Sequence, residues 1–309
     1  MIRDLLRTAA EHERIHAVAT DPRLAGPVVD RYVAGTGVED AVDAAAALVR
    51  GGLLVSVDRL GEDVADIAGA RDTAEGYLRL VAALRDAGLA GSADLSLKLS
   101  SVGQALPGDG QRIAVDLARR IAQAATDAGM TLTLDAEDHT TTDATLATLL
   151  ALREDFPATG AVLQAMLTRT PGDCADLVGV GSRVRLCKGA YDEPAAVAVR
   201  DRQDVRLAYV RCLAVLMAGA GYPMVATHDP VLVDIATALA VRHSRERGSY
   251  EFQMLYGVRP PEQRRLAAQG ERVRVYLPYG SQWYRYMVRR LVERPANVAL
   301  FLRSVVGAR

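Results

Sequence analysis

Cysteine is scarce in this chain, and its scarcity excludes two classes of protein. The 309 residues include only Cys174, Cys187 and Cys212, and none of them belongs to a CxxC pair. An odd number of widely spaced cysteines does not make a disulfide framework, and it lacks the paired spacing of zinc sites. The three residues are typical of a reducing compartment, so we expect a cytoplasmic protein.

The sequence also lacks a dominant charge and a long apolar run. It has 37 Lys and Arg against 38 Asp and Glu, which is not the electrostatic footprint of a nucleic-acid-binding protein. The longest apolar stretch, at 212–221, is too short to cross a membrane. The first residues, MIRDLLRTAAEHERIHAV, are charged throughout and contain no signal-peptide core. The sequence leaves open a peripheral contact at the inner membrane face and the oligomeric state.

Two common phosphate-binding loops are missing as well. No GxGxxG follows the first β-rich run, and no GxxxxGK[ST] occurs in the sequence. These loops hold the phosphates of dinucleotides and nucleoside triphosphates in many α/β proteins. Residues at the ends of strands would therefore have to hold any nucleotide cofactor.

What the chain does contain is a regular series of short β-rich runs. Hydrophobic residues make up 50% of the composition, enough for a large core. Eight runs stand out, at 53–60, 95–100, 131–138, 161–167, 183–191, 224–229, 250–257 and 273–280. Most are nearly continuous in apolar residues, as expected for parallel strands covered on both faces.

The segments between these runs have helical patterning, and several end in glycine, a helix C-cap signal. The pattern is clear at 72–88, 110–129, 143–157 and 194–221, and weakest at 260–270. Eight βα units in one chain predict an α/β fold of the (βα)8 TIM-barrel type. We expect a single domain over residues 1–309, with an N-terminal helical arm over 1–50 and the barrel over 51–309.

Polar residues gather where the predicted strands end, which is where barrel enzymes build their active sites. Lys98 is notable because it lies inside the apolar run LSLKLS. A buried lysine costs several kcal/mol unless it is paired, so we expect a partner and a function for it. The other polar strand-end residues are Asp135, Glu137, Asp138, His139, Gln164, Arg185, Lys188, Tyr191, Thr227, His228, Asp229, Glu251, Gln253, Tyr256, Tyr276 and Tyr279.

One chemistry open to this set is metal-dependent. Asp135, Glu137, His139 and His228 could hold a divalent ion in an aldolase or hydrolase. Against this reading, strand alternation sends Asp135 and Glu137 to one face but Asp138 to the other, and two histidines on separate strands are a weak signal. A barrel that binds an amino acid without turning it over is a further alternative.

The second chemistry is anion binding. Arg185 and Lys188 end one strand, and the stretch YRYMVRRLVERP at 284–295 predicts a helix that places Tyr286, Arg289 and Arg290 on one face. Glu293 is within reach of both arginines. A guanidinium fork matches the two oxygens of a carboxylate, so this pattern would suit an anionic cofactor together with a carboxylate substrate. The alternative for the arginine pair is a solvated basic edge, because charged clusters usually lie at the surface.

Seven motifs, taken in order, resemble those of the proline dehydrogenase family. They are LSLKLS, LTLDAED, VLQAML, VRLCKGAY, ATHD, EFQMLYG and RVYLPYG with WYRYMVRRLVERPANV, and together they span roughly residues 50 to 305. The resemblance is to a stand-alone bacterial form and implies a distorted (βα)8 barrel whose last helix lies over the barrel mouth. It further implies FAD-dependent oxidation of L-proline to Δ1-pyrroline-5-carboxylate by hydride transfer to flavin N5. This would be the first step of proline catabolism to glutamate, with electrons passed to a quinone or another acceptor.

The resemblance also implies roles for individual residues, with no metal among the ligands. Lys98, Arg289 and Arg290 would bind the proline carboxylate, and Tyr276, Tyr286 and Leu186 would surround the ring, beside Tyr191. Asp135 and Glu293 would pair with the cationic side chains. Contacts with FAD would come from Gln164, Arg185, Lys188, Gly189, Ala190, Thr227, His228, Gln253, Arg290 and Glu293.

One departure from the family pattern concerns Asp192, where many relatives have an aromatic residue. A second point concerns substrate choice. Because the ring of Tyr276 would crowd a 4-hydroxyl group, we expect proline to be preferred over hydroxyproline.

Overall fold

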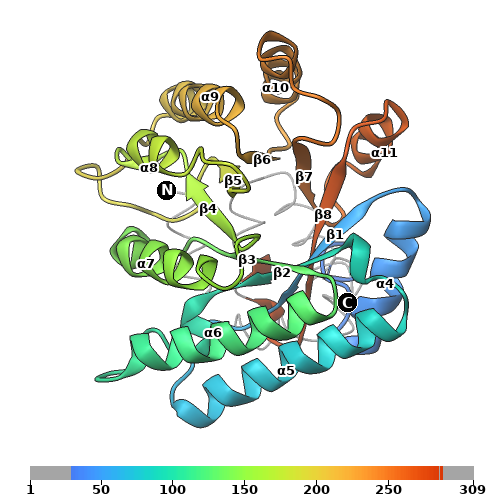
Figure 1. The fold of residues 1–309 in the computed structure, drawn as a ribbon, viewed down its shortest axis with the longest axis vertical. Helices are drawn as coiled ribbons and strands as arrows, with labels where there is room; N and C mark the ends of the chain where they lie inside the picture. The colour runs from blue at the N-terminus through green and yellow to red at the C-terminus, as the bar shows by residue number, and fades with distance from the viewer. Residues whose placement is uncertain (1–28, 285, 288–309) are drawn as a thin grey trace, which may run out of the picture.

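The computed structural model describes residues 29–284, 286 and 287. Eight parallel strands close into a barrel because β8 pairs with β1 in parallel register (Figure 1). The predicted TIM barrel is therefore confirmed. The strands are β1 (Leu54–Arg59), β2 (Ala93–Leu97), β3 (Thr131–Leu134), β4 (Gly160–Gln164), β5 (Arg183–Cys187), β6 (Tyr222–Ala226), β7 (Glu251–Leu255) and β8 (Val273–Tyr279).

Helices follow the strands around the outside of the barrel in the order of the chain (Figure 1). They are α5 (Ile67–Asp86), α6 (Gly110–Asp127), α7 (Thr142–Arg153), α8 (Thr170–Asp176), α9 (Arg202–Ala218), α10 (Pro230–Arg242) and α11 (Pro260–Ala268). Short 3-10 turns add η1 (Ala90–Ser92), η2 (Leu99–Val102) and η3 (His139–Thr141). In the described part of the chain, none of these helices has both the length and the apolar character needed to span a membrane.

Local capping decides where two of the helices form. The segment 194–221 was predicted to be helical throughout, but α9 begins only at Arg202. Asp201 ends the preceding loop, and its carboxylate accepts the backbone N–H groups of Gln203 and Asp204 at 2.8 and 3.3 Å. The weak pattern at 260–270 does form a helix, α11, which starts with proline at its first position.

Part of the predicted arm belongs to the helical layer of the barrel. Helix α4 (Val38–Arg50) lies between α11 and α5 in Figure 1 and contacts β1 and β8. Ala41 and Ala45 on its inner face are fully buried in the main core. Residues 1–28 of the predicted arm lie outside the described residues, as does most of the helix expected over the barrel mouth, which starts at Trp283.

The two faces of the strands differ in a way that the apolar runs did not predict. The faces turned to the helices carry Val, Leu and Phe side chains of the main core. The faces turned inward carry polar and charged side chains that bind one another across the barrel. Four carboxylates and three cations are buried there, namely Asp58, Asp94, Asp135 and Glu251 with Lys98, Arg185 and Arg274, and the partly buried Arg183 lies beside Asp94. Pairing allows this charge to be buried.

Candidate active site

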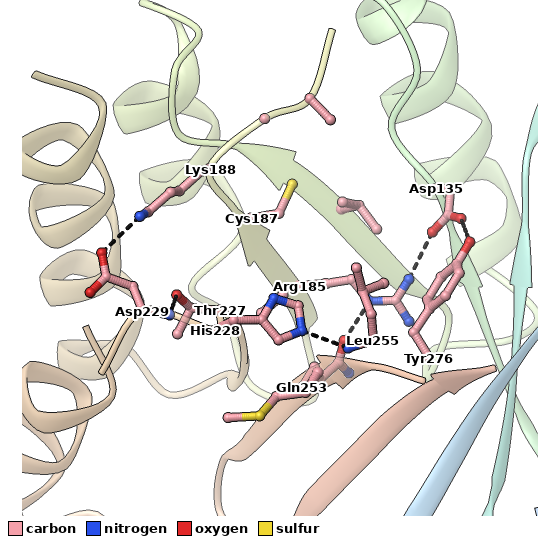
Figure 2. Close-up of a pocket in the computed structure, with 15 residues that line it drawn as sticks. Asp135, Arg185, Cys187, Lys188, Thr227, His228, Asp229, Gln253, Leu255 and Tyr276 are labelled. Carbon is pink, nitrogen blue, oxygen red and sulfur yellow. Dashed lines mark hydrogen bonds and ion pairs between the residues drawn. The ribbon is translucent and has the colours of Figure 1, made fainter. Parts of the chain in front are cut away.

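A cavity of about 510 Å³ opens at the carboxyl ends of β3 to β8 (Figure 2). Loop residues that follow β5 and β6 form much of its wall, as the strand-end pattern predicted. It is lined by Asp135, Val162, Arg185, Cys187, Lys188, Gly189, Ala190, Ala226, Thr227, His228, Asp229, Gln253, Met254, Leu255 and Tyr276. The position fits the rule that barrel active sites form at this face.

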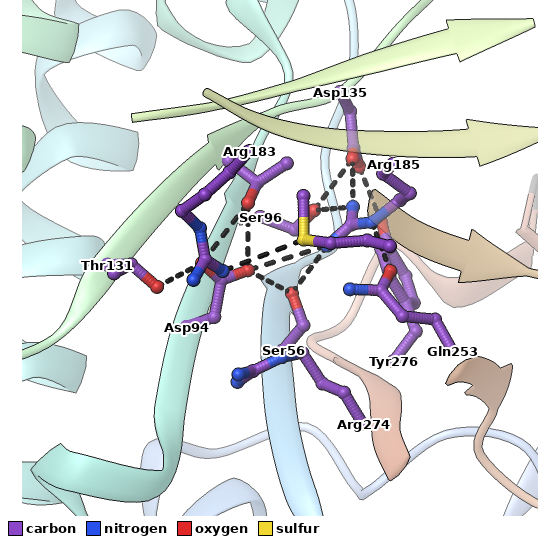
Figure 3. Close-up of polar contacts among 12 residues, drawn as sticks. Ser56, Asp94, Ser96, Thr131, Asp135, Arg183, Arg185, Gln253, Arg274 and Tyr276 are labelled. Atoms are coloured by element: carbon purple, nitrogen blue, oxygen red, sulfur yellow. Dashed lines mark hydrogen bonds and ion pairs between the residues drawn. The ribbon is translucent and has the colours of Figure 1, made fainter. Parts of the chain in front are cut away.

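Arg185 is the fixed positive charge of the cavity. Its side chain is 5% exposed, and its Nε donates to Gln253 Oε1 at 2.5 Å. Its Nη1 donates to Ser96 Oγ and Asp135 Oδ1, both at 2.7 Å. Its Nη2 donates to Ser56 Oγ at 2.9 Å and to Asp94 at 3.4 Å. Since every donor nitrogen is engaged, the guanidinium is held in one orientation (Figure 3).

Asp94 is the second carboxylate in contact with the guanidinium of Arg185. It is fully buried on β2 and accepts hydrogen bonds from Ser56, Thr131 and Thr133. Arg183 approaches its other side at 3.5 Å. The carboxylate therefore lies between two arginines, one facing the cavity and one near the amino ends of the strands (Figure 3).

Asp135 joins Arg185 to Tyr276. Its Oδ1 accepts from Ser96 and Arg185, and its Oδ2 accepts from the Tyr276 hydroxyl, each at 2.7 Å. Burial by itself would raise the pKa of Asp135, but the charges of Arg185 and Lys98 outweigh it and hold this pKa below its usual value. Burial raises the pKa of Tyr276 well above 10. The carboxylate is therefore ionised and the phenol protonated at neutral pH.

Lys98 has the partner that its buried position demands, because Asp58, which was not predicted, lies closer to it than the expected Asp135. Its Nζ lies 2.9 Å from Asp58 Oδ2 and 3.7 Å from Asp135 Oδ2. Burial lowers the lysine pKa by itself, but Asp58 and then Asp135 raise the pKa of Lys98 above its usual value, so the side chain stays charged. Sequence reasoning missed Asp58. Its signal was the inward alternation of Ser56 and Asp58 at the end of the first strand.

A second positive region lies at the outer rim of the cavity. Asp229 caps α10, and its carboxylate accepts from Lys188 at 2.8 Å and lies 3.0 Å from Arg206. Burial opposes ionisation here, but Lys188 and Arg206 together keep the pKa of Asp229 below its usual value. Two cations share one carboxylate, so the rim retains one net positive charge that suits an anionic group.

Gly189 and His228 form part of the cavity wall. Gly189 has φ +110°, and a Cβ there would come within 2.4 Å of Met166 Sδ. His228 Nε2 accepts the backbone N–H of Leu255 at 2.8 Å, so the neutral ring carries its proton on Nδ1. The apolar wall, the amide of Gln253, the cation of Arg185 and the positive rim together could hold a flat, anionic cofactor.

Several predicted residues are not part of the cavity wall. Gln164 donates to the Glu137 carbonyl at 2.7 Å. Tyr191 packs near Met166 in a small apolar cluster. Tyr286 is 6% exposed and packs in another cluster, which includes Leu60. Arg289, Arg290 and Glu293 lie outside the described residues.

The assignment of Leu186 needs correction. It lies between Arg185 and Cys187, which both line the cavity, so strand alternation turns it to the opposite face. There it is fully buried in the main core. The leucine that reaches the cavity is Leu255, at the end of β7.

The proposed metal ligands are engaged elsewhere. Asp135 binds Arg185 and Tyr276, and His139 binds the buried Glu193 through its ring Nδ1 and its backbone N–H. Within residues 29–284, 286 and 287, no three His, Cys, Asp or Glu side chains converge as ligands for an ion.

Comparison with solved structures agrees with the fold. The chain superposes with a TM-score of 0.78 on proline utilization A (PutA) from Bdellovibrio bacteriovorus, at 21% identity, covering 94% of this chain and 38% of the other. The match to PutA from Bradyrhizobium japonicum has a TM-score of 0.73 at 23% identity, covering 94% and 33% of the two chains. The chain thus spans about a third of these longer proteins.

Comparison by sequence is more specific. A family model described as proline dehydrogenase matches residues 41–302. The chain is 38% identical to a proline dehydrogenase of Deinococcus radiodurans, covering 99% of this chain and 98% of the relative. It is 36% identical to proline dehydrogenase 1 of Bacillus subtilis strain 168, with 89% and 90% covered. On this evidence, the chain belongs to the proline dehydrogenase family.

Proposed function

We propose that this protein oxidises L-proline to Δ1-pyrroline-5-carboxylate with FAD as cofactor and passes the electrons to a quinone or another acceptor. Family membership supports the substrate and the reaction. The observation that carries the chemistry is the fixed guanidinium of Arg185 at the cavity, held by Asp135 and Gln253 and 5.4 Å from the centre of the Tyr276 ring.

The reaction removes two electrons and two hydrogens from the proline ring. The bond between nitrogen and the adjacent ring carbon becomes a C=N bond, the carbon loses a hydride and the nitrogen loses a proton. Bound FAD would supply the two-electron acceptor, which no amino-acid side chain can provide. The protein must then bind, orient and shield the reactants.

Arg185 would stabilise negative charge on the reduced cofactor. It is preorganised by five hydrogen bonds and nearly excluded from water, so it needs little reorganisation during the reaction. Contacts with FAD would also come from Lys188, Gly189, Thr227 and Gln253. His228, Ala190 and Gln164 complete the proposed cofactor set, together with Arg290 and Glu293.

Lys98 would provide one of the positive charges for the proline carboxylate, and Arg289 and Arg290 would provide the others. A carboxylate held at several points fixes the ring in one orientation, which favours hydride transfer. Tyr276 and Leu255 would shield the ring from water, with Tyr286 and Tyr191 nearby.

The direct test is the stoichiometry of turnover. The purified, FAD-loaded chain is mixed with L-proline and a soluble quinone, and both products are measured. We expect one Δ1-pyrroline-5-carboxylate for each quinone reduced. Arg185→Gln should lower kcat/KM by about 100-fold or more, whereas Arg112→Gln, which removes an exposed guanidinium on α6, should leave it unchanged. Quinone reduction without pyrroline formation would contradict the proposal.

A further inference from the structure

Asp58 lies at the carboxyl end of β1, with its side chain inside the barrel and 1% exposed. The register of β1 and β2 pairs Asp58 with Ser96, two residues before Lys98. This brings two residues that are 40 positions apart in the sequence into direct contact, with Asp58 Oδ2 2.9 Å from Lys98 Nζ.

The two buried carboxylates near Lys98 are not equivalent. Asp135 already accepts three hydrogen bonds of 2.7 Å, from Ser96, Arg185 and Tyr276. Its distance of 3.7 Å to Lys98 is too long for a hydrogen bond. Asp58 is therefore the hydrogen-bonded partner of Lys98, whereas Asp135 is the partner of Arg185.

Asp58 in turn depends on Lys98. Its other oxygen, Oδ1, is buried and has no hydrogen-bond partner among the residues that the structure describes. Burial raises the pKa of Asp58, and Lys98 is the largest influence that opposes this rise. An ionised carboxylate with one bare oxygen is costly in the interior unless a cation offsets it.

The backbone of Lys98 is fixed separately from its side chain. The Ser101 hydroxyl donates to the Lys98 carbonyl at 2.7 Å. Glu137, on the neighbouring loop, accepts from the backbone N–H of Ser100 at 3.0 Å and from its hydroxyl. With the backbone held by these contacts, Asp58 is the group that directs the ammonium.

We propose that Asp58 is a positioning residue, which holds the ammonium of Lys98 where it can bind the carboxylate of the substrate. Asp135 then remains the hydrogen-bonded partner of Arg185. The inference rests on the proposed role of Lys98 in binding that carboxylate. It predicts that Asp58 acts through Lys98 and has little effect on turnover once the lysine is gone.

A double-mutant cycle tests this prediction. Asp58→Asn should lower kcat/KM for proline by about 100-fold, the loss expected from a displaced binding group. In a Lys98→Met background the same change should alter kcat/KM by about threefold at most. Equal losses in the two backgrounds, or a loss of less than about threefold in the wild-type background, would overturn the proposal.

A matched control removes a carboxylate that has no contact with Lys98. Asp72→Asn removes a carboxylate on α5 that pairs with Arg59, the residue that follows Asp58 in the sequence. The side chain of Asp72 is 66% exposed, whereas that of Asp58 is buried. We expect it to leave KM, kcat and FAD binding unchanged. Asp58→Asn should raise KM while FAD affinity and the flavin spectrum stay the same, because Asp58 does not line the cavity.

Two further comparisons keep the test decisive. If Asp58→Asn alone does not fold, Lys98→Met is compared with the double variant, which removes both buried charges. An additional tenfold loss in the double variant would refute the proposal. The cycle is also measured as binding of tetrahydrofuran-2-carboxylate, in which oxygen replaces the ring nitrogen. If the protein does not turn over proline but binds this compound in a way that depends on the Asp58–Lys98 pair, the proposed function is contradicted and this inference still holds.

Discussion

Replacing Asp135 with asparagine should release Arg185 from its fixed position and so lower both stability and activity. The contacts of Asp135 give the expected size of the loss of stability. Asparagine retains one acceptor oxygen but presents an NH₂ group in place of the other. It can no longer satisfy Arg185 and Tyr276 together, which now donate to separate oxygens at 2.7 Å. Breaking one half of a buried ion pair typically costs about 3–5 kcal/mol, because the remaining charge is left without its partner.

Tyr276→Phe is the matched comparison. It removes the hydroxyl that donates to Asp135 but leaves the ion pair with Arg185 in place. The loss of one hydrogen bond to a charged group corresponds to about 1.5–3 kcal/mol. Asp135→Asn should therefore be clearly the more destabilising of the two changes.

Urea unfolding of the FAD-saturated proteins measures this difference, and kcat/KM for proline is determined on the same preparations. We expect Asp135→Asn to give the lower unfolding midpoint and the larger loss of kcat/KM. A midpoint equal to that of the wild type, or a larger effect from Tyr276→Phe, would refute the idea that Asp135 holds Arg185 in place.

Three further predictions follow from single contacts. Gly189→Ala should weaken FAD binding, measured by fluorescence titration, because the new methyl group would collide with Met166 at a backbone φ of +110°; unchanged affinity would contradict this account. Tyr276→Ser should raise the ratio of 4-hydroxyproline to proline turnover by about tenfold, and a constant ratio would contradict the proposed crowding. Burial alone would raise the pKa of Glu251, but Arg274 outweighs it and holds this pKa below 4.5. Glu251 therefore stabilises the fold at pH values above that of the unfolded carboxyl, and this stability is lost as the pH falls through the lower, folded-state pKa. Glu251→Gln should lower the free energy of unfolding at pH 7 by about 3–5 kcal/mol, and this free energy should then fall less steeply as the pH is lowered. Urea unfolding measured over a range of pH tests this, and a variant whose free energy of unfolding falls with pH as steeply as that of the wild type would contradict it.

The barrel could be predicted from the sequence because its strands are locally encoded. Each β-rich run lies between helical segments, and the polar residues that end the runs mark one face of the barrel. Asp135, Arg185 and Gln253 were found in this way, and the structure brings them together around one guanidinium. Their grouping follows from the fold alone, because carboxyl ends of parallel strands converge.

The pairing of residues could not be predicted, because it depends on strand register. Asp58 and Lys98 meet only because Asp58 lies opposite Ser96 in the neighbouring strand. Nothing in the local sequence fixes that alignment, and a shift by one residue would turn Asp58 to the other face. The error over Leu186 has the same origin, because the face of β5 that meets the cavity has to be known before a role is assigned.

The start of α9 shows a different limit. Apolar periodicity continues through residues 194–201, yet the helix begins only after the Asp201 cap. A capping carboxylate that accepts two backbone N–H groups determined the boundary, and the periodic pattern did not reveal it.

The most direct test of the account is the visible spectrum of the purified protein before and after anaerobic addition of L-proline. We predict an oxidised flavin spectrum that bleaches when proline is added and recovers when a quinone follows. Bleaching should be about 100-fold slower or more in Arg185→Gln and should keep its wild-type rate in Arg112→Gln. A flavin that stays oxidised in the presence of proline would contradict the proposed substrate, and a protein that takes up no FAD would contradict the proposed cofactor.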